Sequence, residues 1–128
     1  MTKYSFDMRE IMRITKALAD PHRVRVLLAL QGRDLCVCQI GNLFGLAPST
    51  ISKHLSTLYH AGLIESRKSE RWVFYRLSGK EATVAVREAI RWVLQSLGDD
   101  PQTVADRKKL KQILKIDPSI LCQRQARK

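Results

Sequence analysis

The sequence predicts a mainly α-helical chain that contains one small β-hairpin. Through most of its 128 residues, apolar side chains recur every three or four positions, which is the spacing of one face of an α-helix. Residues 63–77 depart from this spacing, and their second half is rich in aromatic and β-branched residues that alternate as in a half-buried strand. The length fits a single domain that is large enough to bury a core.

An apolar stripe and a capping signal mark the first two helices. Met8 and Met12 belong to a stripe of near-helical spacing, so we expect a helix within the first twenty residues. Asp20 followed by Pro21 is a cap with proline at the first helical position, which predicts the start of a second helix. Gly32 is a plausible end for that helix.

A short helix over residues 38–44 and a longer one over residues 48–60 are predicted next. Residues 45–47 form a tight connection of the kind found between the two helices of a helix-turn-helix. The apolar residues of the longer helix fall on one buried face: Ile51, Leu55 and Leu58. Mostly small polar residues form its other face, and such a helix suits insertion into the DNA major groove.

Two short strands are expected over residues 63–68 and 72–77. Residues 68–71 form a polar turn between them that carries two cations. A helix-turn-helix followed by such a hairpin is the winged form of the motif, whose tip can reach a phosphate or the minor groove. The predicted fold class is therefore a winged helix-turn-helix.

A long helix is expected over residues 80–97, with a continuous apolar seam of Val86, Ile90, Val93 and Leu97. We favour the use of this seam, together with the first helix, as a homodimer interface over packing within one chain, because two-fold dimers read symmetric DNA sites. A further helix should begin at Pro101 and reach residue 116, and the last ten residues are expected to be poorly ordered. Residues 1–100 then form a DNA-binding and dimerisation domain, and residues 101–128 a C-terminal helix and basic tail.

The net charge of +11 is concentrated in two regions. Residues 107–128 hold eight basic residues and one acidic residue (+7), and residues 48–77 hold five and two (+3). A basic balance of this size suits a polyanionic partner such as DNA. The alternative is a solvated basic tail that aids solubility.

Several classes of protein are disfavoured by what the sequence lacks. It contains no apolar run long enough to cross a membrane, and its first residues lack the apolar core of a signal peptide, so we expect a cytoplasmic protein without a membrane partner. It offers no glycine-rich phosphate loop, no nucleophile elbow and no partnered acid–base set. We therefore expect neither an enzyme nor a catalytic cofactor.

Five short motifs occur together and in order: Ala19-Asp20-Pro21-His22-Arg23, Asp34-Leu35-Cys36-Val37-Cys38, Ser49 to Leu58, Ala61-Gly62-Leu63-Ile64, and Tyr75-Arg76-Leu77. In these motifs, residues 8–97 resemble the ArsR–SmtB group of metal-responsive transcriptional repressors, and most of all its arsenite- and antimonite-responsive branch. The resemblance implies a homodimer that binds double-stranded operator DNA without metal and releases it when metal binds.

The resemblance also implies which residues contact DNA. In the helix over residues 48–60 they are Ser49, Thr50, Ser52, Lys53 and His54. In the wing the phosphate candidates are Arg67, Lys68 and Arg71. For His54 the alternative is a role in packing between helices.

Cys36 and Cys38 are the candidate ligands for the inducer, arsenite or antimonite, because thiolates select soft or borderline ions. Residues two apart on an α-helix point about 200° away from each other, so the two thiols can share an ion only where the third helix starts later or unwinds. Arsenic-responsive members often carry a third cysteine where this chain has Gly41, which leaves Cys122 as the remaining protein thiol. Cadmium or lead as inducer, and a metal-free thiol switch that uses Cys122, stay open as alternatives.

Overall fold

The structure is a computed structural model that describes residues 7–126; the first six residues of the predicted first helix and the last two of the basic tail lie outside this part. The chain forms, in order, α1 (Met8–Ala17), α2 (Pro21–Ala29), β1 (Leu35–Cys36), α3 (Val37–Phe44), α4 (Pro48–His60), β2 (Ile64–Ser69), β3 (Trp72–Leu77), α5 (Val84–Leu97), α6 (Pro101–Ile113) and α7 (Pro118–Ala126). The mainly α-helical winged helix-turn-helix is confirmed: α3 and α4 form the helix pair, and β2 and β3 form the wing.

The helix starts follow the local sequence. Asp20 caps α2, because its Oδ1 accepts hydrogen bonds from the backbone N–H of His22 at 2.8 Å and of Arg23 at 3.4 Å. Pro21 occupies the first turn, where no backbone donor is needed. Thr83 caps α5 in the same way, so this helix starts at Val84 and not at residue 80 as predicted.

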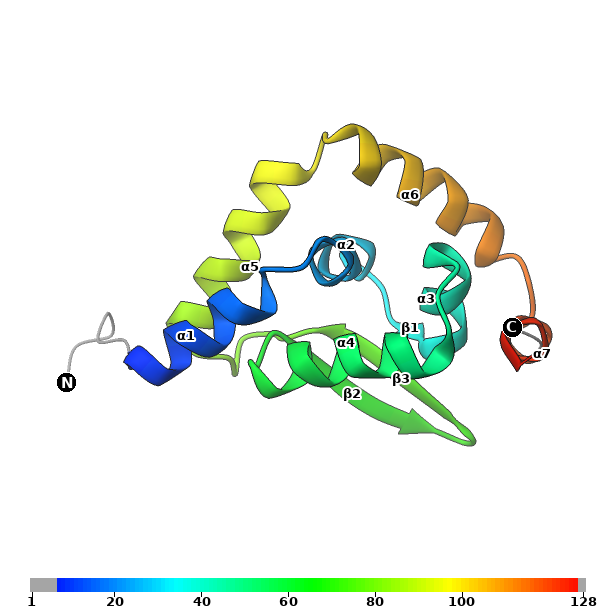
Figure 1. The fold of residues 1–128 in the computed structure, drawn as a ribbon, viewed down its shortest axis with the longest axis horizontal. Coiled ribbons are helices and arrows are strands. Elements are labelled where there is room, and N and C mark those ends of the chain that lie inside the picture. Colours follow the sequence, from blue (N-terminus) through cyan, green and yellow to red (C-terminus); the bar gives the residue numbers. More distant parts are fainter. Residues whose placement is uncertain (1–6, 127–128) are drawn as a thin grey trace.

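The helices surround one apolar core (Figure 1). In that view α2 lies at the centre, with α1 and α5 on one side, α6 arching over the top and α4 with the wing below. Contacts join α2 to α4, α5 and α6, and α3 to α4, α6 and α7. The fully buried side chains include Leu27, Ile40, Ile51, Leu55 and Leu58. None of the helices within residues 7–126 is long and apolar enough to cross a membrane.

The wing belongs to a three-stranded antiparallel sheet with the order β1-β3-β2. The predicted hairpin is confirmed, and its register pairs Ile64 with Leu77 and Ser69 with Trp72. The sequence did not predict β1, which pairs Leu35 with Tyr75. A strand of two residues has no periodicity of its own, so its pairing depends on the position of β3.

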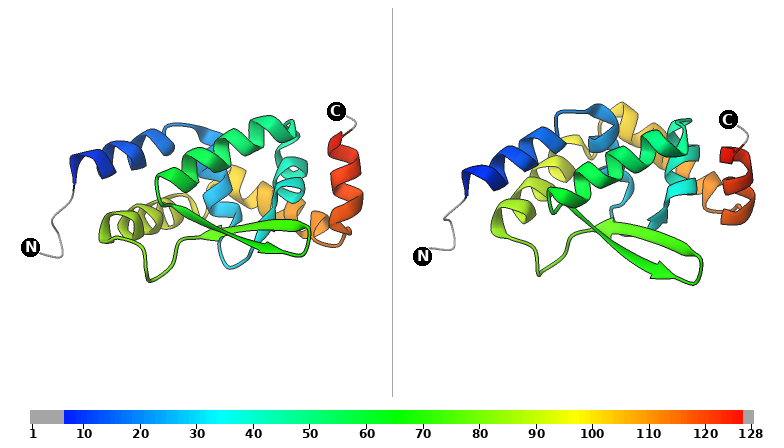
Figure 2. Two further views of the ribbon diagram at one scale, coloured as in Figure 1. Left: turned by 90° about the horizontal axis from the view of Figure 1, so that it is seen from below. Right: turned by 60° about the horizontal axis from the view of Figure 1, so that its bottom comes forward.

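The expectation of a poorly ordered C-terminus is wrong, because α7 is a helix packed against α3 (Figure 2). Leu121 is fully buried and anchors it. Asn42 of α3 donates hydrogen bonds from Nδ2 to the carbonyl oxygens of Cys38, at 2.8 Å, and of Leu121, at 3.3 Å. A single buried anchor, Leu121, does not produce a repeating apolar pattern in the sequence. The sequence therefore gave no signal for a packed helix at this position.

Candidate nucleic-acid interface and cysteine site

The exposed face of α4 carries four of the predicted DNA-contacting residues. Ile51, Leu55 and Leu58 are buried, and this stripe turns the opposite face of the helix outward. That outer face presents Ser49, Thr50, Ser52 and Lys53, all of them exposed. The first turn begins at Pro48, and the free backbone N–H groups of a helix start form a site suited to phosphate.

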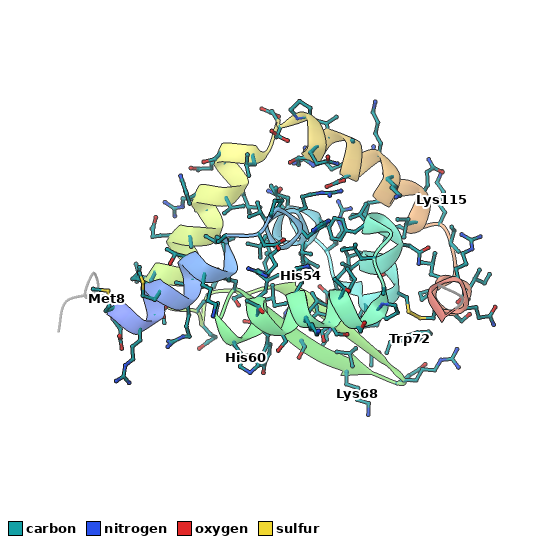
Figure 3. All side chains as sticks on the ribbon, in the orientation of Figure 1. Met8, His54, His60, Lys68, Trp72 and Lys115 are labelled. Atoms are coloured by element: carbon teal, nitrogen blue, oxygen red, sulfur yellow. A yellow bond between two sulfur atoms is a disulfide. The ribbon has the colours of Figure 1, made fainter. Side chains whose placement is uncertain are left out.

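His54 lies on the inner side of α4 and contacts α2 (Figure 3). Its imidazole stacks on that of His22 with ring centroids 5.8 Å apart, and its Nδ1 lies 3.3 Å from Nη1 of Arg23. Burial is the largest cause that lowers the pKa of His54; Asp20 raises it, Arg23 and His22 lower it further, and the net pKa is lowered. These contacts are those of a packing histidine, and its contact with DNA stays a prediction.

The wing holds cations in two different settings. Arg67 is engaged within the protein: its Nε donates to Oδ2 of Asp34 at 2.8 Å, and its guanidinium lies 5.0 Å from the ring centroid of Phe74. Lys68 and Arg71 are exposed at the tip and form no ion pair within residues 7–126, although the guanidinium of Arg71 lies 4.9 Å from the ring centroid of Trp72. Lys68 points away from the body of the molecule, on the side where the wing and α4 lie (Figure 3).

Cys36 ends β1 and caps α3. Its backbone is extended, with φ −92° and ψ 167°, and its N–H donates to Oε1 of Gln39 at 2.9 Å. Cys36 is only 2% exposed, so it belongs to the core. The strand β1 explains this position, because it places Cys36 beside β3, where it pairs with Phe74.

Cys38 lies in the first turn of α3 and forms a disulfide with Cys122 of α7. The Cα atoms of the two residues are 5.0 Å apart. Cys122 was included in the predicted site only as a further thiol, because nothing local in the sequence shows where its helix docks. The structure thus brings Cys38 and Cys122 together, while the thiol of Cys36 is directed into the core.

The start of α3 bears on the geometry of the two neighbouring cysteines. The helix begins at Val37, one residue before the predicted start, so Cys36 is extended and Cys38 is helical. The two side chains point in different directions, one into the core and one toward α7. A shared ligand would therefore require a rearrangement of the first turn of α3.

Apolar side chains remain exposed where α1 and α5 lie side by side. Met8 and Met12 of α1 are 73% and 51% exposed, and Trp92 of α5 is 66% exposed. An apolar groove beside them is lined by Leu18, Val24, Trp92, Val93, Ser96 and Leu97. The predicted seam of α5 is divided, because Val86, Ile90 and Val93 are buried in this chain's own core.

Comparison with known proteins agrees with this architecture. Residues 20–66 match the family described as "Bacterial regulatory protein, arsR family". The arsenic resistance transcriptional regulator ArsR1 of Pseudomonas putida is 41% identical over 75 residues, which are 55% of this chain and 58% of that protein. The cadmium resistance transcriptional regulatory protein CadC homolog of Staphylococcus aureus is 33% identical over 82 residues, 62% of this chain and 67% of that protein.

A solved structure shows the same fold. The homodimeric winged helix-turn-helix DNA-binding domain Mb0332 of Mycobacterium bovis, a possible ArsR-family transcriptional regulator, has a TM-score of 0.59 and 26% identity, covering 73% of this chain and 82% of that one. The match to ArsR1 spans 58% of that protein's length, so this chain is compared with part of it. The resemblance to the ArsR–SmtB group is confirmed, and the chain belongs to the arsR family of bacterial regulatory proteins.

Proposed function

We propose that this protein is a homodimeric transcriptional repressor that releases its operator when Cys36 and Cys38 bind trivalent arsenic or antimony. The observation that carries the proposal is the position of the cysteines. They lie at the start of α3, and α3 packs against α4, which bears the exposed polar face. A rearrangement at the start of α3 would therefore move α4.

The surface on the α4 side supports DNA binding. Lys53 on α4 and Lys68 and Arg71 on the wing are exposed cations on two neighbouring elements, and α4 contacts β2. Small hydroxyl side chains beside a helix start bind phosphate and position a protein on the duplex, while longer side chains reach base edges. A bacterial regulator that binds DNA must reach the chromosome, so we place the protein in the cytoplasm.

The thiols fit a soft trivalent ligand in chemical type. Each cysteine thiol that binds would replace one hydroxyl group of arsenous acid and release one water molecule. Cys122 can supply the third sulfur, since its Cα lies 5.0 Å from that of Cys38 and α7 holds it there. Arsenic can bind in this way only to the reduced protein, because a disulfide sulfur has no S–H group to replace a hydroxyl group on arsenic.

A second copy of the chain is the occupant that we propose for the exposed apolar side chains of α1 and α5. Two-fold dimers suit symmetric operators. Met8, Met12 and Trp92 would become buried in such a dimer, and the exposure of so large a side chain as Trp92 favours this arrangement. The solved relative Mb0332 is described as a homodimer.

The proposal is tested by selecting a duplex from random DNA with the reduced protein and then adding arsenite. We expect a selected sequence with two-fold symmetry, bound by two chains and released by arsenite. Failure to enrich any duplex, or enrichment without release, would contradict the proposal.

A thiol switch is a second candidate function, favoured by the contact between Cys38 and Cys122. Hydrogen peroxide would oxidise both thiols to the disulfide and would itself be reduced to two molecules of water. Intact mass would fall by two hydrogens on oxidation, and operator binding measured on the same sample shows whether the disulfide acts as a signal. Cadmium and lead are further candidate inducers, and parallel titrations with both ions separate them from arsenite.

A further inference from the structure

A cluster of metal-ligating side chains lies away from the cysteines, between α2 and the recognition helix α4. Among the described residues, Asp20, His22 and His54 each offer one ligand atom, and these atoms all lie within 4.8 Å of one another. Asp20 caps α2, His22 lies in the first turn of α2, and His54 comes from the middle of α4. Residues from two helices therefore converge at one point.

The side chains of the cluster are held by their neighbours. Asp20 is fixed through its Oδ1, which accepts from the N–H of His22 at 2.8 Å, and this oxygen lies 3.8 Å from Nδ1 of His22. The His22 ring lies between two others: it stacks on His54 with an interplanar angle of 27° and meets Phe44 edge-on. A site whose ligands are already oriented loses less conformational freedom when an ion binds.

We propose that Asp20, His22 and His54 form a binding site for a borderline divalent cation of the zinc class. Two imidazole nitrogens and one carboxylate oxygen are a donor set used by zinc, and three protein ligands leave a fourth position for water. This donor set differs from the soft thiolates of Cys36 and Cys38, so the site would select a different ion. A bound ion would tie the start of α2 to α4.

Burial, the largest cause, lowers the pKa of His54, and a neutral imidazole is the form that binds metal ions. Burial raises the pKa of Asp20, but the hydrogen bonds from His22 and Arg23 and the nearby positive charges lower it overall.

Arg23 opposes the cation and limits the affinity of the site. Its Nη1 lies 3.3 Å from Nδ1 of His54, and its Nε and Nη2 donate to the carbonyl oxygens of Ala17 and Lys16 at 2.7 and 3.0 Å. A guanidinium donates and cannot accept, so Nδ1 of His54 accepts from it in this state. An ion bound to Nδ1 of His54 would displace this hydrogen bond directly. An ion bound to Nε2 would leave the ring proton on Nδ1, which could then no longer accept from Arg23. Replacing Arg23 by glutamine should therefore strengthen cation binding.

The test uses the full chain with the Cys38–Cys122 disulfide formed, which leaves the buried Cys36 as the third, unpaired cysteine. Zinc affinity is measured by competition with a chromophoric chelator. We expect one zinc per chain, about tenfold or more weaker binding in His22→Ala and His54→Ala, and tighter binding in Arg23→Gln. His60→Ala is the matched control, because His60 is an exposed histidine of the same helix and should not affect the affinity.

A second measurement does not depend on whether the variants fold. In the wild-type protein, zinc should shift the imidazole nitrogen resonances of His22 and His54 and leave those of His60 unchanged. The proposal is overturned if zinc does not bind with one equivalent per chain. It is also overturned if His60 responds as His22 and His54 do, or if all three alanine variants bind alike.

Discussion

The disulfide between Cys38 and Cys122 joins the first turn of α3 to α7 across a sequence separation of 84 residues. The same contact is supported without the sulfur bond, because Leu121 is fully buried and Asn42 bridges the two helices. Reduction should therefore leave Cys122 beside Cys38 and available as a ligand. The C-terminal helix α7 would then be part of the proposed sensor, because it supplies Cys122 as a ligand.

Changing Cys122 to serine should weaken arsenite binding by the reduced protein roughly tenfold or more, about 1.4 kcal/mol, because one of three sulfur ligands is lost. Isothermal titration calorimetry measures the effect. Gln123→Ala is the control, since Gln123 is the exposed neighbour on the same helix. Unchanged affinity in the serine variant would mean that arsenic is held without Cys122.

Changing Lys53 to alanine should weaken operator binding and reduce the slope of log K against log salt by about one unit, because one cation is lost from the interface. The slope is measured by fluorescence anisotropy over a series of salt concentrations. Lys115→Ala removes the same charge from an exposed position just past the end of α6, away from α4 in Figure 3, and should leave the slope nearly unchanged. Equal slopes for both variants would contradict the assignment of the DNA-binding face to α4.

Changing Trp92 to arginine should convert the protein to a monomer, because it places a charge in the proposed dimer interface. Sedimentation velocity separates the two states. Val104→Arg is the comparison, since Val104 is 40% exposed on α6, outside that interface. A Trp92→Arg protein that stays dimeric would place the interface elsewhere.

The ion pair of Arg25 with Asp106 ties α6 to α2. Nε and Nη2 of Arg25 donate to the two carboxylate oxygens at 2.9 Å each, and the Asp106 side chain is 11% exposed. Asp106→Ala should lower the free energy of unfolding by about 1–3 kcal/mol, because it leaves a half-buried guanidinium without its acceptor. Urea denaturation at one fixed protein concentration measures this loss. Lys109→Ala, an exposed change on α6, should cost much less, and equal losses would show that the pair contributes little.

Local patterns predicted much of this fold. The spacing of Ile51, Leu55 and Leu58 predicted α4 with its correct buried face, and Asp20 with Pro21 predicted the start of α2. The alternation of β3 predicted a strand with the observed bounds. These features depend on residues close in sequence, whose side chains either share one face of an element or cap it.

The parts that sequence did not predict depend on distant residues. β1 becomes a strand only because β3 pairs with it, and this pairing buries Cys36. The docking of α7 depends on the fully buried Leu121 and on its hydrogen bond with Asn42, 79 residues away in sequence. His22 and His54 were separate residues in the sequence, and the crossing of α2 and α4 is what brings them together.

In the proposed mechanism, Cys36 and Cys38 couple inducer binding to operator release. This coupling is tested by the anisotropy of a labelled operator duplex bound by the reduced protein at fixed salt, with and without arsenite. Arsenite should weaken binding by the wild-type protein about tenfold or more and have no effect on the Cys36→Ser, Cys38→Ser double variant, which should still bind the operator. Arsenite-induced release that is equal in both proteins, or absent in the wild type, would contradict this mechanism.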